Sequence, residues 1–169
     1  MAAAILIARL VLGLGMAAHG AQKLFGWFGG YGLKGTGGFF ETLGFRPGPL
    51  FAFAAGLGEF GGGVLTALGL GGPVGPALVV VVMLVAILTV HAGHGFFVSK
   101  NGVELPLTYI SGMLVIALAG AGPYSLDALL RIGSVWPAES AWIAIGAAIV
   151  LALLNLGVRR PKSQTEAHA

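Results

Sequence analysis

The sequence predicts an all-α protein built as a polytopic bundle of transmembrane helices. Hydrophobic residues make up 57% of the 169 residues and charged residues only 9%, whereas soluble domains carry about 25% charged residues. Several apolar runs approach the ~20 residues that a helix needs to cross a bilayer. The 30 glycines fit this class, since small residues let helices approach closely in lipid. The lipid bilayer is therefore the first partner that the sequence implies.

Composition also limits the chemistry of the chain. The absence of cysteine excludes disulfides, thiolate metal ligands and a thiol relay. The net charge of +3 is small and bears on membrane orientation rather than on nucleic acid. The sequence has no haem-attachment pattern and no nucleotide-binding glycine fingerprint. We expect no intrinsic cofactor, no metal site and no nucleic-acid partner, so any redox chemistry has to come from a substrate or a partner protein.

Five segments qualify, or nearly qualify, as spanning helices. The third contains the run "ALVVVVMLVAIL", which is apolar on every face as a lipid-facing helix should be. None of the five has the strong amphipathic period of a soluble bundle. The five segments are residues 3–23, 49–70, 74–91, 105–122 and 140–158.

The longer connections are predicted to lie at the membrane surface. Within residues 24–48, Phe39, Phe40 and Leu43 recur at helical spacing, which indicates a short interfacial helix. Residues 123–139 are expected to hold another. The tryptophans lie near the expected membrane boundaries, as in an aromatic belt. They are Trp27, Trp136 and Trp142.

The basic residues predict an orientation. With five spans, Arg131 and the N-terminus fall on one side of the membrane. Because Lys and Arg gather in cytoplasmic loops, the N-terminus is expected outside and the C-terminus inside. This prediction depends on the count of five spans. The basic residues on the other side are Lys23, Lys34, Arg46, Lys100, Arg159, Arg160 and Lys162.

Two charged residues fall inside apolar spans. Arg9 lies in the first span and Glu59 near the middle of the second, where a charge costs ~2.5–3.5 kcal/mol on insertion scales. We expect them to form an intramembrane pair, beside close helix packing at Gly58 and Gly62. The pair either only fixes packing or serves as a proton acceptor or ligand anchor.

A second polar group is predicted at the cytoplasmic ends of the helices. His19, Gln22 and Lys23 share one helix face because they are three and four residues apart. His91 ends the third span and Glu104 opens the fourth. We expect these five residues to converge on one ligand-binding pocket.

Two other interpretations of this group are open. Histidines and carboxylates are suitable metal ligands, but their spacing matches no recognised ligand motif. A pocket that uses the histidines as hydrogen-bond partners or proton carriers is favoured over a metal. Alternatively, His19 and Lys23 only extend toward the membrane surface from the end of their helix.

These residues lie in segments that resemble the DoxX family. The resemblance rests on "HGAQKLFGWFGG", the glycine-flanked Glu59, "HAGHGFFVSKNGVELPL" and "GAGPYSLD", in that order. It covers residues 5–127 and implies a small bacterial inner-membrane protein with a four-helix core. The chain departs from the pattern in its extra apolar segment and in His94. The matching motif positions are Arg9, His19, Gln22, Lys23, Glu59, His91 and Glu104.

The resemblance also implies an association with membrane redox chemistry, since the family takes its name from a subunit linked to a quinol oxidase and to thiosulfate:quinone oxidoreductase. The favoured hypothesis is a quinone-linked subunit, or a partner of membrane or soluble oxidoreductase subunits, with quinone as its ligand. Whether the chain is itself an enzyme, and whether it forms a homo-oligomer, stays open. A non-catalytic membrane scaffold and a small-solute or proton transporter are the alternatives.

The expected organisation has three parts. Residues 1–127 form the DoxX-like four-helix membrane core, and residues 128–158 form a short interfacial segment and a fifth transmembrane helix. Residues 159–169 form a polar basic tail.

Overall fold

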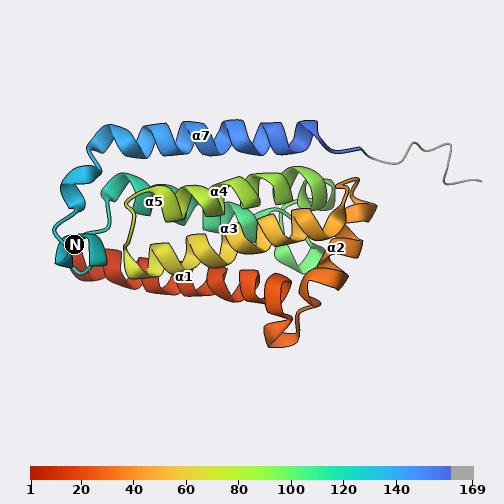
Figure 1. Cartoon of the computed structure of the whole chain (residues 1–169), viewed down its shortest axis with the longest axis horizontal. Helices are drawn as coiled ribbons and strands as arrows, with labels where there is room; N and C mark the ends of the chain where they lie inside the picture. The colour runs from red at the N-terminus through yellow and green to blue at the C-terminus, as the bar shows by residue number, and fades with distance from the viewer. Residues whose placement is uncertain (161–169) are drawn as a thin grey trace, which may run out of the picture.

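A computed structural model describes residues 1–160, and within them the chain is helical with no strand. The basic tail predicted for residues 159–169 lies outside the described residues from residue 161 onward. Five long helices run side by side (Figure 1). They are α1 (Ala2–Phe25), α3 (Gly48–Leu68), α4 (Val74–Ala86), α5 (Glu104–Ala119) and α7 (Ala138–Gly157). The predicted all-α bundle is confirmed.

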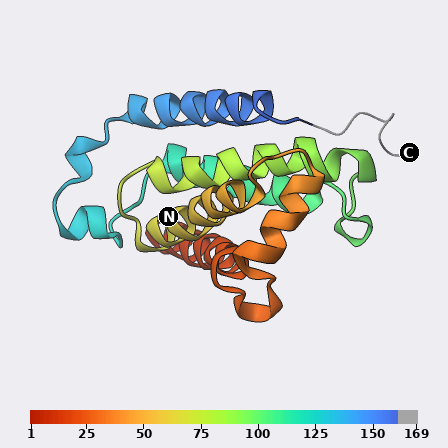
Figure 2. The ribbon, with the colours of Figure 1, turned by 45° about the vertical axis from the view of Figure 1, so that its right-hand side comes forward.

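Shorter helices join these five. They are η1 (Trp27–Gly29), α2 (Gly32–Thr42), η2 (Ile87–His91), η3 (Ala92–His94), η4 (Val98–Lys100), α6 (Leu126–Leu129) and η5 (Gly133–Val135). α2 lies across one end of the bundle (Figures 1 and 2). It occupies the region where an interfacial helix was predicted, and its Phe39 is exposed.

Four of the long helices are long and apolar enough to cross a membrane. They are α1, α3, α7 and the continuous helix that α4 forms with its extension to His94. α5 is shorter: its 16 residues rise only about 24 Å at 1.5 Å per residue, less than the ~30 Å hydrocarbon core. It nevertheless lies among the others, and the chain alternates direction through all five (Figure 1).

Glycines set the closest contact of the bundle, between α1 and α3. A Cβ atom on Gly13 would lie 2.6 Å from the backbone nitrogen of Ala67, and one on Gly20 would lie 2.3 Å from that of Phe60. The two antiparallel backbones therefore touch, which only small residues permit. Gly58 and Gly62 instead face α4, where Val82 and the Gly75 carbonyl approach them.

The other long helices build a core on this pair. α4 packs on α3 and α5, and α7 covers α4 (Figure 1). α7 turns small side chains inward, whereas Trp142 and Leu154 on its other faces are exposed. The central buried side chains are Met16, Val79, Val80, Met83, Met113 and Ala148.

The end of the bundle that holds the N-terminus is fastened by polar groups. Asp127 is buried, and its carboxylate accepts hydrogen bonds from the backbone N–H groups of Gly71 and Gly72 at 2.9 and 2.8 Å. These two hydrogen bonds tie α6 to the turn between α3 and α4. Trp136 packs its ring over Gly72 and is half-buried, so only Trp27 and Trp142 have the exposed rings expected of an aromatic belt.

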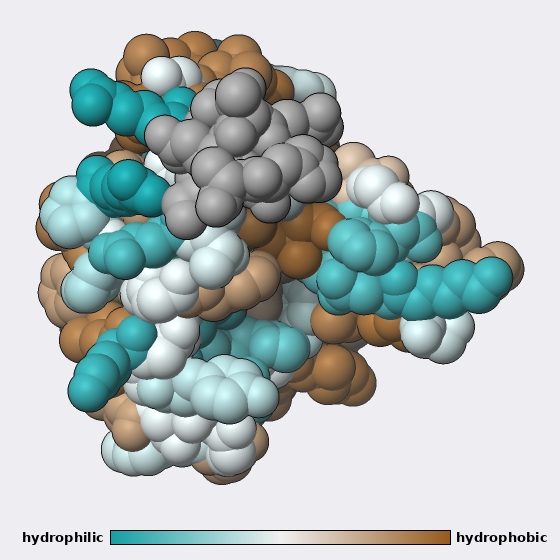
Figure 3. All heavy atoms as spheres, turned by 90° about the vertical axis from the view of Figure 1, so that its right-hand side faces the viewer, coloured by the Kyte–Doolittle hydropathy of each residue, from teal (hydrophilic) through white to brown (hydrophobic). Residues whose placement is uncertain are grey.

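The opposite end carries most of the basic residues of the described chain. Lys23 lies in the last turn of α1, Lys100 precedes α5, and Arg159 follows α7. Figure 3 views the molecule from this side and shows hydrophilic side chains spread over this end, with hydrophobic side chains between and around them.

Candidate functional site

A buried ion pair joins α1 to α3 at the basic end of the bundle. The ammonium of Lys23 lies 2.8 and 2.5 Å from the two carboxylate oxygens of Glu59. The Glu59 side chain is only 2% exposed, whereas that of Lys23 is 24% exposed. Pairing a buried carboxylate in this way offsets the large cost of removing its charge from water.

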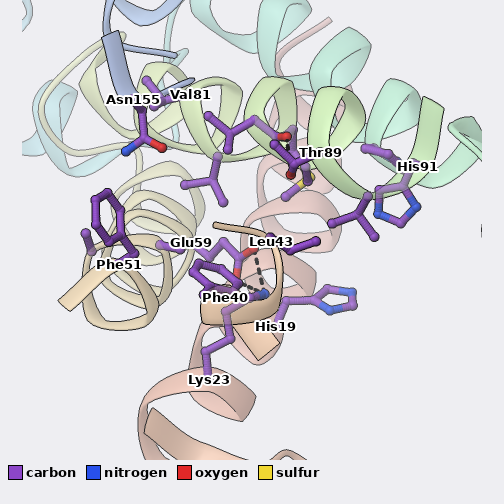
Figure 4. Close-up of a pocket in the computed structure, with 18 of the residues that line it drawn as sticks. His19, Lys23, Phe40, Leu43, Phe51, Glu59, Val81, Thr89, His91 and Asn155 are labelled. Carbon is purple, nitrogen blue, oxygen red and sulfur yellow. Dashed lines mark hydrogen bonds and ion pairs between the residues drawn. The ribbon is translucent and has the colours of Figure 1, made fainter. Parts of the chain in front are cut away.

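This pair forms part of the wall of a cavity of about 380 Å³ (Figure 4). α1, α2, α3, α4, α5 and α7 all contribute lining residues. The wall is mainly aliphatic and aromatic, with a few polar groups, as is usual for sites that bind small molecules. The polar side chains that line it are His19, Lys23, Glu59, Thr89, His91, Tyr109 and Asn155.

His19 stands against Tyr109 on α5. Their ring centroids are 6.0 Å apart and the rings meet edge to face. Gly15, one helical turn before His19, makes room for the Tyr109 hydroxyl, which lies 2.6 Å from where a Cβ atom would be. Both rings are half-buried and line the cavity. The predicted role of His19 in a pocket is therefore compatible with its position.

His91 reaches the same cavity from a π-helical turn, Ile87–His91. Such turns are rare and are frequently found at functional sites. The Nδ1 atom of His91 lies 2.7 Å from the carbonyl oxygen of Asn101. Because a carbonyl can only accept, Nδ1 carries the proton, and Nε2 of the neutral ring is left as an acceptor. His94 bonds to the Val90 carbonyl instead and does not line the cavity.

Two of the five predicted ligand-binding residues are absent from the cavity wall. The Gln22 amide donates to the Phe28 carbonyl at 3.2 Å and so holds the loop after α1. The Glu104 carboxylate accepts from the backbone N–H of Val98 at 2.8 Å and closes the loop before α5. Each side chain satisfies a local backbone group, so the structure brings together only His19, Lys23 and His91 of the predicted set.

The predicted Arg9–Glu59 pair is wrong. The buried Arg9 guanidinium donates to the carbonyl oxygens of Ala67 at 3.2 Å, of Tyr124 at 2.9 Å and of Ala121. The Ala67 carbonyl lies in the last turn of α3, where carbonyls lack partners within the helix and carry the negative end of its dipole. Ala121 and Tyr124 lie in the loop between α5 and α6. The register of α1 on α3, fixed by the glycine contacts, sets Arg9 opposite Ala67 and leaves Glu59 within reach of Lys23.

Sequence reasoning missed Tyr109, Asn155 and the partner of Glu59. Asn155 had a signal, because it is the single polar side chain in the apolar run "IVLALLNLGV". Tyr109 had a weaker one, as a lone aromatic residue in "LPLTYISG". Among residues 1–160, no three His, Asp or Glu side chains gather closely enough to hold a metal ion.

The family model of DoxX matches residues 4–92, which are 89 of the 169 residues. The chain belongs to the DoxX family. Together with the apolar helices, this makes it a multi-pass membrane protein. The match includes Arg9, His19, Lys23, Glu59 and His91, but it ends before α5 and α7. The resemblance inferred for residues 93–127 extends beyond this match.

This DoxX protein also resembles an uncharacterized protein of Haemophilus influenzae. The two are 38% identical over 63 residues, which are 37% of this chain and 40% of that protein. The chain thus spans about two fifths of the length of the curated relative that it matches. No solved structure matches the chain.

Proposed function

We propose that this DoxX protein binds the ring of a lipophilic quinone in the cavity between its helices, as a quinone-linked subunit or partner of an oxidoreductase system in a bacterial inner membrane. One observation carries the proposal: an apolar cavity of about 380 Å³ with a few polar side chains in its wall. A quinone is a flat apolar ring with a carbonyl acceptor at each end. Such a ligand needs apolar walls and a small number of well-placed donors.

The wall supplies groups suited to both redox forms of such a ring. Lys23 and Tyr109 carry donors for quinone carbonyls, whereas Glu59 and Nε2 of His91 are acceptors for quinol hydroxyls. Reduction of a quinone to a quinol takes two electrons and two protons. The proposed role of the chain is to hold the ring and exchange the protons, and the electrons come from a partner oxidoreductase.

The test is equilibrium binding of menadione, a quinone without a hydrocarbon chain, and of its quinol form, to the purified protein in nanodiscs. Because the chain contains no cysteine, covalent addition of menadione to thiols cannot imitate binding. His91→Ala removes one acceptor from the wall and is expected to weaken binding of the reduced ring about fivefold to tenfold, the equivalent of one hydrogen bond.

His94→Ala is the matched control. His94 lies three residues from His91 and also bonds to a backbone carbonyl, but it is outside the cavity wall. The His94→Ala variant is expected to leave the affinity for the ring unchanged. No binding to the wild type, or equal losses in both variants, contradicts the proposal. Copurification of an oxidoreductase without quinone binding would then favour the scaffold alternative. Uptake of a small solute or of protons into proteoliposomes, if Glu59→Gln abolishes it, would favour the transporter alternative.

A further inference from the structure

This inference rests on the proposed function and concerns the part of the ligand that the cavity cannot hold. A volume of about 380 Å³ is near the lower end of the ≈300–1,000 Å³ usual for small-molecule sites. It has room for a quinone ring but not for a long isoprenoid chain as well. If a membrane quinone is the ligand, its chain must leave the cavity toward the lipid.

The cavity wall reaches the surface of the bundle between α3 and α7. Phe51 and Ala54 of α3 line the cavity together with Asn155 of α7, yet α7 packs on α4 and α5 and has little contact with α3. Ala54 is exposed although it belongs to the cavity wall. We call this part of the cavity wall, formed by Phe51, Ala54 and Asn155, the α3–α7 window.

Asn155 marks the inner edge of this window. Its side chain lies beside the cavity, on the opposite side of Glu59 from His91 (Figure 4). Within residues 1–160 its amide has no hydrogen-bond partner, although it is half-buried in an apolar helix. A polar group without a partner is costly in lipid, so a ligand that accepts from this amide would relieve the cost.

The far end of α7 is fastened to the end of α2. The Arg159 side chain donates to the Leu43 carbonyl, and the Arg160 backbone N–H donates to the Gly44 carbonyl at 2.8 Å. Leu43 itself lines the cavity. These contacts close the basic end of the window and hold Asn155, four residues before Arg159, at the cavity wall.

We infer that the ligand is a quinone with a long hydrocarbon chain that enters sideways from the bilayer, and that its chain occupies the α3–α7 window. The Asn155 amide donates to the ring carbonyl nearest the window. The helix α7, which lies outside the family match, thus completes the site.

The test compares two ligands that share one ring: menadione, without a chain, and a long-chain menaquinone. Ala54→Phe narrows the window and is expected to weaken menaquinone binding in nanodiscs at least tenfold more than it weakens menadione binding. Retained menadione binding also shows that the variant is folded. The matched control is Ala147→Phe, since Ala147 is exposed on α7 but outside the cavity wall; it is expected to change neither affinity.

A second variant tests the amide. Asn155→Leu is expected to weaken both ligands about fivefold to tenfold, because the lost bond is to the ring. If the wild type binds both ligands and Ala54→Phe affects them equally or not at all, the window is refuted while the proposed function stands. If Asn155→Leu leaves both affinities unchanged, the assigned bond is refuted. If the wild type binds neither ligand, the proposed function fails and the window fails with it.

Discussion

The ion pair between Lys23 and Glu59 makes a directional prediction about stability. Lys23→Met leaves the Glu59 carboxylate, which is 2% exposed, without its partner. Removing one member of a buried pair costs about 3–5 kcal/mol, and the 24% exposure of Lys23 lowers our expectation to about 2–4 kcal/mol. Glu59→Gln is expected to cost only about 1 kcal/mol, because the long Lys23 side chain can turn its ammonium toward water.

A double-variant cycle measures the pairing itself. With Lys23→Met in place, adding Glu59→Gln removes the unpaired charge, so the double variant should be more stable than Lys23→Met alone. The coupling free energy should exceed about 1 kcal/mol, as for contacting residues. Unfolding is followed by tryptophan fluorescence in mixed micelles with increasing SDS. Lys34→Met, at an exposed lysine of α2, is the control. The reasoning is refuted if Glu59→Gln costs as much as Lys23→Met, or if the coupling vanishes.

Three further predictions concern the framework. Gly20→Ala should lower the free energy of unfolding in the SDS titration by about 1–3 kcal/mol, because the added Cβ atom would lie 2.3 Å from the Phe60 backbone nitrogen. The control is Gly146→Ala, which has open space around the added Cβ atom and should cause no loss of stability. Arg9→Met should lower the free energy of unfolding by about 3 kcal/mol, because it leaves the carbonyl groups that Arg9 binds unpaired. An SDS-unfolding midpoint equal to that of the wild type would contradict this. Asp127→Asn should lower the free energy of unfolding by about 1–2 kcal/mol. It should also accelerate hydrogen exchange at the backbone amides of Gly71 and Gly72, which the carboxylate binds; unchanged exchange rates would contradict this role.

The sequence predicted the class of the fold because composition and apolar length decide it. A chain with so few charges must bury its surface in lipid, and each long helix forms near an expected span. The convergence of His19, Lys23 and His91 was also predictable, since alternating spans carry the ends of α1 and α4 to the same side of a bundle. Asn155 could have been found as a single polar residue in an apolar helix.

The partners of the buried charges could not be read from the sequence in the same way. Arg9 and Glu59 fall at compatible depths, but the register of two helices depends on which glycines interlock. Because Arg9 and Lys23 are 14 residues apart on α1, a register shift of about four turns exchanges the partner of Glu59 from Arg9 to Lys23. The carbonyls that bind Arg9 belong to the last turn of α3 and to the loop between α5 and α6, 58–115 residues away, and only the folded chain brings them together. Backbone acceptors leave no sign in side-chain patterns.

The central claim is that a quinone ring lies between the helices, and photoaffinity labelling tests it most directly. The protein in nanodiscs would be irradiated with an azido-substituted quinone and digested, and the labelled peptides identified by mass spectrometry. We predict label on the segments that hold His19, Tyr109 and His91, and its suppression by excess unlabelled quinone. Label spread over the lipid-facing residues of α7, such as Trp142 and Leu154, without competition would contradict the account.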